Sequence, residues 1–253
     1  SYNTSDQVRS VAISADGEYI AAGSWDKVYL FGKNSSTPLW NYTTESIVWS
    51  VAISADGEYV AAGSADNKVY LFDKDSSTPL WSYNTGGRVW SVAISADGEY
   101  IVAGTWGPSS TGDCDENSCK VYLFDKDSST PLWSYGTGDM VWSVAISADG
   151  EYIAAGFYYK VYLFDKNSST PLWSHDTMEV AYSVAISADG EYISAGTGGW
   201  YDYNKVYLFN KDSSTPLWSN NKEGKVYSSA ISADGKYIAA GSAMYAELID
   251  DNN

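Results

Sequence analysis

The sequence repeats itself six times, and this periodicity limits the possible folds more than any other feature. The letters Ile-Ser-Ala-Asp-Gly recur in each copy, with the aspartate at Asp16, Asp56, Asp97, Asp149, Asp189 and Asp234. Most copies are about 40 residues apart, and the longer intervals carry insertions at 107–119 and 198–204. A repeat of this length is one supersecondary unit that must bury its hydrophobic face against its neighbours.

Each copy contains four short β-type segments separated by turn sequences. In the second copy, residues 48–54 and 59–63 are apolar or small, and Ala55-Asp56-Gly57 forms a tight turn between them. Residues 68–72 give a third strand and residues 79–83 a fourth. No segment of ten or more residues has a helical apolar period. The pattern predicts an all-β fold, a six-bladed β-propeller with four antiparallel strands per blade.

Side-chain size supports this geometry. The first two strands use small residues such as Ala52 and Ala61, whereas the last two use Tyr70, Phe72 and Trp81. Blades converge at a central axis, so small side chains fit inside and large ones fill the outer gaps. A solenoid, the main rival, would need polar capping repeats, and the sequence has none.

The two ends of the sequence complement one another. Residues 1–4 match residues 82–85, the end of a fourth strand, and residues 245–250 match a third strand. We therefore expect the N-terminal strand to complete the last blade and close the ring, which removes exposed sheet edges. The tryptophan of that strand would fall just before Ser1. We expect a single domain over residues 1–253 that is part of a longer chain.

Two halves of the repeat resemble known propeller repeats. Residues 50–59, Ser-Val-Ala-Ile-Ser-Ala-Asp-Gly-Glu-Tyr, followed by Ala-Ala-Gly-Ser at 61–64, resemble the first half of WD40 and surface-layer (YVTN-like) repeats. Residues 69–73 and 80–83 resemble the PQQ-like repeat, in which a strand ends in tryptophan. The resemblance covers nearly the whole chain and implies a propeller.

The departures from these families limit what the resemblance implies. WD40 blades usually carry a histidine and a Trp-Asp pair, whereas this chain has one histidine, His175, and Phe72-Asp73 in place of the pair. PQQ enzymes are about twice as long, with eight blades, adjacent cysteines and a calcium site, and nothing here matches those features. The resemblance therefore does not imply the PQQ cofactor, and we expect no cofactor.

The net charge of −17 restricts the partners. Such a field repels phosphate backbones, so we expect no nucleic acid partner. It favours cationic partners, or it only keeps a β-rich protein soluble. No apolar run approaches the roughly 18–20 residues that cross a bilayer, so we expect no membrane insertion by this domain.

Differences between the copies indicate where a binding site lies. The turn at Ala-Asp-Gly and the turn before Pro-Leu-Trp hardly vary, whereas the other two connections of each copy vary greatly. Up-and-down strand order places these two variable sets on one rim. Because loops on a rigid scaffold usually carry binding residues, the variable rim is the predicted site.

Two sets of residues on this rim are candidate ligand-binding residues. The loops carry Trp25, Trp106, Tyr158 and Trp200. The entrances to the innermost strands carry Arg9, Trp49, Trp90, Trp142, Tyr182 and Tyr227. If the second set points toward the axis, it rings the channel mouth, where aromatic faces stack on sugars, cap peptide side chains or attract cations. The alternative is that this set packs between blades as core.

Other recurring residues are expected to be structural. Five tryptophans recur in identical context and are predicted to pack: Trp40, Trp81, Trp133, Trp173 and Trp218. Asp16 and its five equivalents are predicted turn residues. His175 stands alone, in place of a tyrosine, so a catalytic triad or a zinc site is not expected. We expect no enzyme, although paired carboxylates leave a hydrolytic or PQQ-like enzyme as an alternative.

One insertion loop contains both cysteines. Cys114 and Cys119 are close enough in sequence for a local disulfide, which we predict over a pair of reduced thiols. Asp113, Asp115 and Glu116 flank Cys114 and form a weak candidate for a hard cation such as calcium. A solvated acidic loop is the simpler interpretation.

Four sequons bear on the location, at Asn3, Asn34, Asn41 and Asn167. Together with the acidity and the disulfide, they predict an extracellular or cell-surface protein with possible N-glycosylation. Our leading hypothesis is a non-catalytic extracellular or cell-envelope propeller that mediates protein or glycan binding or assembly through its aromatic rim. The alternative is a purely structural repeat of a surface layer or filament.

Overall fold

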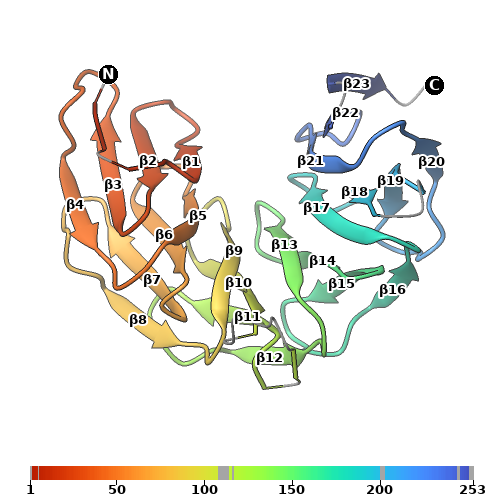
Figure 1. The fold of residues 1–253 in the computed structure, drawn as a ribbon, viewed down its shortest axis with the longest axis horizontal. Coiled ribbons are helices and arrows are strands. Elements are labelled where there is room, and N and C mark those ends of the chain that lie inside the picture. The colour runs from red at the N-terminus through yellow and green to blue at the C-terminus, as the bar shows by residue number, and fades with distance from the viewer. Residues whose placement is uncertain are drawn as a thin grey trace. The chain divides into compact units, whose positions relative to one another are not determined.

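The computed structural model describes residues 2–4, 6–107, 114–115, 117–199, 203–243 and the backbone of 246–250. Within these ranges the chain forms 23 β-strands and no helix (Figure 1). Accordingly, no described segment is a helix able to span a membrane. The strands fall into two compact units, Ser1–Gly138 (unit 1) and Asp139–Asn253 (unit 2). Whether the two units form one domain stays a prediction.

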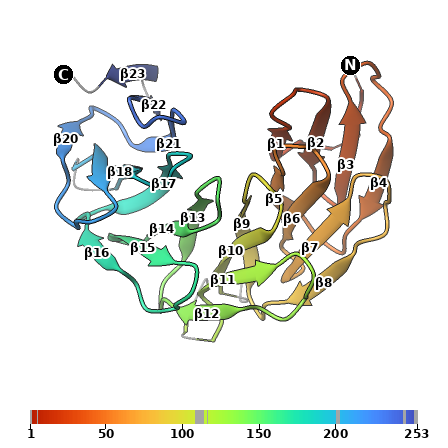
Figure 2. The ribbon, with the colours of Figure 1, turned by 180° about the vertical axis from the view of Figure 1, so that it is seen from behind.

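Unit 1 contains three sheets, blades 1 to 3 (Figure 2). Blade 1 comprises β1 (Ser10–Ile13), β2 (Tyr19–Gly23), β3 (Lys27–Gly32) and β4 (Trp40–Thr43). Blade 2 comprises β5 (Val48–Ile53), β6 (Tyr59–Ser64), β7 (Lys68–Asp73) and β8 (Trp81–Asn84). Blade 3 comprises β9 (Arg88–Ile94), β10 (Tyr100–Trp106), β11 (Lys120–Asp125) and β12 (Trp133–Gly136). Each strand pairs antiparallel with the next along the chain.

Unit 2 contains blades 4 to 6. Blade 4 comprises β13 (Val141–Ile146), β14 (Tyr152–Phe157), β15 (Lys160–Asp165) and β16 (Trp173–Asp176). Blade 5 comprises β17 (Val180–Ile186), β18 (Tyr192–Gly198), β19 (Lys205–Asn210) and β20 (Trp218–Asn221). Blade 6 comprises β21 (Val226–Ile231), β22 (Tyr237–Ser242) and β23 (Ala246–Asp250). The predicted all-β architecture of antiparallel blades is confirmed, with three strands in the described part of the last blade.

The Ser-Ala-Asp-Gly turn is a self-contained hydrogen-bonded unit. In blade 1, the Ser14 hydroxyl and the Glu18 N–H both donate to Oδ1 of Asp16, at 2.6 and 2.9 Å. These bonds stabilise the charged carboxylate, and they lower the pKa of Asp16. The predicted turn role of the aspartates is confirmed, because Asp56, Asp97, Asp149, Asp189 and Asp234 make the same bonds.

The glycine of this turn also joins neighbouring blades. Gly57 has a φ of +75°, which favours glycine, and a Cβ there would lie 2.5 Å from Cδ2 of Tyr19 in blade 1. Gly98 meets Tyr59 in the same way. Any larger residue would therefore strain the backbone and displace the tyrosine ring.

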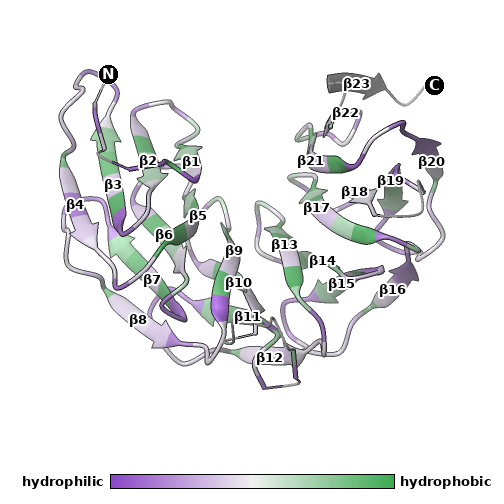
Figure 3. Cartoon of the chain, in the orientation of Figure 1, coloured by the Kyte–Doolittle hydropathy of each residue, from purple (hydrophilic) through white to green (hydrophobic). Residues whose placement is uncertain are grey.

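The core lies between the faces of adjacent blades. Val28 and Leu30 of β3 are fully buried against Val48 and Val51 of the next blade. In contrast, the outer strands β4, β8, β16 and β20 are more hydrophilic than middle strands such as β3 and β7 (Figure 3). The core between blades is therefore formed mainly by the inner and middle strands, where small and branched residues such as Ala21, Val48 and Val51 are buried.

The predicted packing role of the repeated tryptophans is confirmed where the blades can be compared within a unit. The indole N–H of Trp40 donates to the carbonyl oxygen of Lys74 at 2.7 Å, and its ring centroid lies 5.3 Å from that of Phe72. Trp81 and Trp173 make equivalent bonds at 2.7 Å to Lys126 and Lys211. Each of these three tryptophans therefore fastens the outer strand of one blade to the next blade, whereas the indole nitrogen of Trp218 has no hydrogen-bond partner among the described residues.

Candidate functional site

Five of the six residues at the strand entrances are the extra residues of β-bulges. Between β5 and β6, Val48 pairs with Ser64 and Ser50 pairs with Gly63, so Trp49 opposes no partner. The same skip occurs at Trp90, Trp142, Tyr182 and Tyr227. A bulge re-aims a side chain and is frequent beside functional sites.

In unit 1 the two bulged tryptophans form one continuous cluster with their neighbours. We call it the tryptophan–arginine cluster, and it consists of Arg9, Trp49, Trp90, Trp106 and Arg88. The ring centroids of Trp49 and Trp90 lie 4.5 Å apart, and those of Trp90 and Trp106 lie 5.4 Å apart. Cζ of Arg9 lies 5.2 Å from the ring centroid of Trp49, and Cζ of Arg88 lies 5.9 Å from that of Trp106. A guanidinium at each end thus meets an indole.

Serine side chains hold the innermost strands at this spacing. The N–H of Val51 donates to Oγ of Ser10, and the N–H of Val92 donates to Oγ of Ser50, both at 3.1 Å. Each serine directly follows a residue of the cluster, Arg9 or Trp49. Our sequence reasoning missed these serines. Their signal is a serine after each ring residue, namely Ser10, Ser50, Ser91, Ser143, Ser183 and Ser228.

Unit 2 contains a shorter group of the same type. The rings of Trp142 and Tyr182 lie 5.1 Å apart, and those of Tyr182 and Tyr227 lie 5.2 Å apart. Burial raises the pKa of the Tyr182 hydroxyl. Tyr158 is exposed and makes an edge contact with Tyr159 at 4.3 Å. The structure thus gathers the predicted residues within each unit, and their role in binding stays a prediction.

The charge of the tryptophan–arginine cluster differs from that of the rest of the chain. Arg9 and Arg88 are the only arginines in a sequence of net charge −17. Neither guanidinium has an ion pair among the described residues, whereas Lys74 and Lys126 each contact two carboxylates. Within the described ranges, the positive charge of the two arginines is therefore not neutralised by a carboxylate.

One polar atom of the cluster is also unsatisfied. The indole nitrogen of Trp49 is buried and has no hydrogen-bond partner in the described part of the chain. A buried N–H without an acceptor costs about 1–3 kcal/mol, so an acceptor on a ligand would be stabilising there.

The remaining loop residues are placed as follows. Trp25 follows β2 and is 49% exposed. Trp106 ends β10, where it pairs with Arg88 and belongs to the cluster. Trp200 lies outside the described residues.

The insertion loop of blade 3 adjoins the cluster. Cys114 and Cys119 are joined in a disulfide, and Cys119 is fully buried. Asp115 accepts hydrogen bonds from Ser118 Oγ and N–H, both at 2.7 Å, which lower its pKa. Asp115 therefore caps a turn. Asp113 and Glu116 lie outside the described residues, and the rest contains no group of three potential metal ligands.

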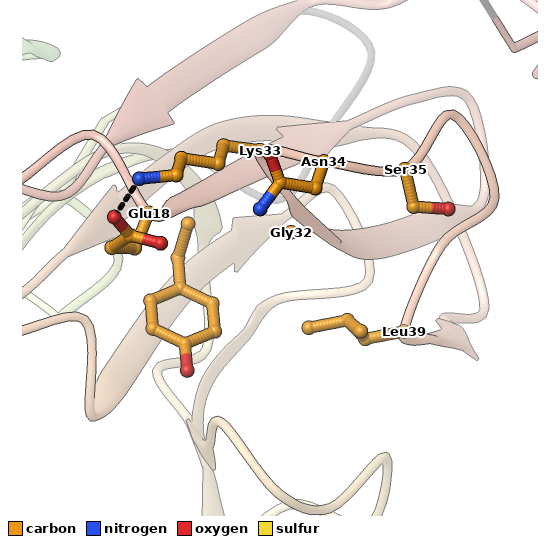
Figure 4. A pocket seen from close by; sticks show the side chains of 7 residues that line it. Glu18, Gly32, Lys33, Asn34, Ser35 and Leu39 are labelled. Carbon is orange, nitrogen blue, oxygen red and sulfur yellow. Dashed lines mark hydrogen bonds and ion pairs between the residues drawn. The ribbon is translucent and has the colours of Figure 1, made fainter.

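The four sequons lie on exposed asparagines, Asn3, Asn34, Asn41 and Asn167. Asn34 lines a pocket together with Tyr19, Gly32 and Leu39, and the ion pair of Lys33 with Glu18 lies at one side (Figure 4). Gly32 stands where β7, β11 and β15 end in aspartate. Exposure permits glycosylation, which stays a prediction.

Comparison with known proteins agrees with this architecture. Repeated antiparallel blades define the chain as a β-propeller. The family model "WD domain, G-beta repeat" matches residues 1–28, 36–73, 77–123 and 129–165, more than half of the sequence, and the chain belongs to the WD40 family. WD40 propellers generally serve as protein-interaction scaffolds and are typically non-catalytic. The resemblance to surface-layer and PQQ-like repeats is not confirmed by a family match.

Solved structures show the same fold at low sequence identity. A chain from "Crystal Structure of Mitotic Checkpoint Complex" superposes with a TM-score of 0.79 at 17% identity, covering 99% of this chain and 79% of that one. A chain of Kuenenia stuttgartiensis hydrazine synthase gives a TM-score of 0.76 at 17% identity, covering 96% and 76%. The search of curated proteins gave no match.

Proposed function

We propose that this chain is a non-catalytic binding module that holds a protein partner at the tryptophan–arginine cluster. The observation that carries this proposal is the unbroken contact from Arg9 through Trp49, Trp90 and Trp106 to Arg88. Tryptophan and arginine are the residues that dominate binding energy at protein interfaces, where they cluster near the centre. Membership of the WD40 family supports a protein partner over a glycan.

The physical role of each part follows from its chemistry. The partly buried indoles offer apolar area at low entropic cost, and the bulges hold them on a rigid sheet. The two guanidiniums can form bidentate hydrogen bonds to carboxylates, and no carboxylate of the described residues forms an ion pair with them. A partner with an apolar or aromatic anchor flanked by acidic groups would contact the indoles through its anchor and the guanidiniums through its acidic groups.

We further propose an extracellular or cell-envelope location. The disulfide between Cys114 and Cys119 supports it, because such bonds persist in oxidising compartments. The exposed sequons and the net charge of −17 agree with it. Mass spectrometry of the protein from its source would show a glycan on at least one sequon, and reduced thiols in the native protein would contradict the location.

A pull-down from an envelope extract of the source tests the binding proposal. The bait is compared with W49A/W90A, which breaks the tryptophan–arginine cluster, and with W142A/Y182A as a matched control in unit 2. We expect the partner to be retained by the parent and the control and lost from W49A/W90A. Circular dichroism must show that both variants are folded.

Two other outcomes would replace the proposal. If both variants retain the partner, the cluster is not the site. If folded parent protein retains nothing specific, the chain is a structural spacer, as near-identical blades would permit. Glycan binding, the other use of stacked indoles, would appear as retention of carbohydrate in place of protein.

A further inference from the structure

Three tryptophans of the repeat, Trp40, Trp81 and Trp173, form a constant arrangement with the aromatic residue two positions later. In β4, Trp40 covers Phe72, and Tyr42 lies 5.5 Å from Tyr70 and 5.2 Å from Phe72. The carbonyl of Lys74, two residues after Phe72, accepts the indole N–H. The same arrangement occurs with Trp81, Tyr83, Tyr122, Phe124 and Lys126, and with Trp173, His175, Tyr207, Phe209 and Lys211.

In blade 1, the N-terminal segment supplies the aromatic ring that follows the tryptophan in the other blades. The ring of Tyr2 lies 5.8 Å from Tyr29 and 5.6 Å from Phe31. The hydroxyl of Tyr29 donates to the carbonyl oxygen of Thr4 at 3.3 Å. The equivalent bonds join Tyr122 to Thr85 at 2.8 Å and Tyr207 to Thr177 at 3.4 Å. Residues 2–4 therefore occupy the place where a fourth strand ends.

In blade 1, the position that corresponds to the repeat tryptophan is an open pocket. Beside Tyr2 the pocket is lined by Val11, Phe31, Gly32, Lys33 and Ser35. Phe31 is partly exposed, whereas Phe72, Phe124 and Phe209 are fully buried. The side chain of Lys33 is 46% exposed, compared with 18–20% for Lys74, Lys126 and Lys211. Blade 1 thus has the receiving surface of the other blades without the covering indole.

We propose that this pocket is the binding site of a tryptophan side chain carried by an extended segment with the sequence of the repeat, Ser-Thr-Pro-Leu-Trp. In four of the five copies that carry the tryptophan, an aromatic ring follows two positions later, and Tyr2 takes the place of that second ring in blade 1. Its indole N–H donates to the carbonyl of Lys33, and its ring covers Phe31. Because Tyr2 contacts Tyr29 and Phe31, an indole placed just before it would enter the pocket at a high effective concentration and require little intrinsic affinity.

The test adds Ser-Thr-Pro-Leu-Trp, the sequence that precedes Asn41 and Ser82, in front of Ser1 of the full chain. The control carries Ser-Thr-Pro-Leu-Ala. We expect the tryptophan form to unfold about 5 °C higher than the control, since one buried indole is worth several degrees in a chain of this size. Equal midpoints for the two extensions would overturn the proposal.

A second variant tests the pocket itself. In F31A the gain from the added tryptophan should fall to less than half, whereas L39A, at an exposed leucine of the same blade, should keep it. An undiminished gain in F31A would overturn the site. If F31A does not fold, hydrogen exchange at a ¹⁵N-labelled indole in the added tryptophan tests whether the pocket binds it. Slow exchange supports the bond to Lys33, and exchange at the rate of free tryptophan overturns it.

Discussion

Trp49 and Trp90 come from the innermost strands of two adjacent blades, and their ring centroids lie 4.5 Å apart at an interplanar angle of 31°. Each follows a fully buried valine and precedes a serine, in the sequence Val-Trp-Ser. The neighbouring valines, Val48 and Val89, point into the core between the blades. The two tryptophans therefore contact each other beside the core, and we expect them to contribute less to stability than the outer tryptophans do.

The first prediction compares the two tryptophan positions of one repeat. W81A removes the hydrogen bond to Lys126 and the packing on Phe124, so we expect a loss of about 3–4 kcal/mol in the free energy of unfolding. W90A removes a partly buried ring that contacts Trp49 and Trp106, and we expect a smaller loss of about 1–2 kcal/mol. Urea denaturation measures both. Equal losses would mean that Trp90 belongs to the core.

The second prediction concerns the serine that joins the innermost strands. S50A leaves the N–H of Val92 without its acceptor, and we expect a loss of about 1–2 kcal/mol in the free energy of unfolding. S82A, at an exposed serine on β8, is the control and should change stability by less than about 0.5 kcal/mol. If S50A behaves like S82A in urea denaturation, the bond does not hold the blades together.

A pH dependence is expected from His175, the chain's only histidine. Burial against Tyr207 and Phe209 lowers its pKa in the folded protein below the ordinary value of about 6.5. Below that pH the unfolded chain binds more protons, so this contribution to stability is present above about pH 6.5 and declines as the pH falls. H175Y, which restores the residue found at Tyr83, should remove this slope.

Thermal unfolding between pH 7.5 and 5 checks the histidine prediction, because the difference between parent and H175Y isolates one group. The slope due to one proton is at most about 1.4 kcal/mol per pH unit. A parent protein that gains stability relative to H175Y as the pH falls would contradict the sign.

The disulfide prediction uses C114A/C119A, which avoids burying a hydroxyl at the fully buried Cys119. Opening a loop this short should cost about 2 kcal/mol in the free energy of unfolding by the chain-entropy relation. Dithiothreitol should lower the parent's stability by a similar amount and leave the variant unchanged. An effect of dithiothreitol on the variant would indicate another cause.

Much of the fold is predictable because the repeat carries local signals. The predicted third strand, residues 68–72, matches β7 (Lys68–Asp73), and the turn role of Asp56 follows from its short side chain. The fourth strand was predicted from residue 79 but β8 begins at Trp81, because Pro79 has no N–H to give to a ladder. These signals depend only on residues within one copy.

The orientation of the rim residues was not predictable in the same way. Alternation along a strand decides which face a side chain occupies, and one inserted residue reverses that assignment. The bulge at Trp49 is such an insertion, and it depends on the pairing of β5 with β6. The contact of Trp106 with Trp90 joins positions 16 residues apart, and nothing within one strand encodes it.

The bulges have a consequence for how such a chain can change. Since Trp49 or Trp90 has no opposite residue in its ladder, replacing it leaves the register and the interblade bonds of Ser50 untouched. Variation at these positions therefore costs some stability but leaves the strand pairing in place, and copies made by duplication can diverge one rim position at a time. The same positions would serve a protein engineer as a set of randomisable sites on an unaltered frame.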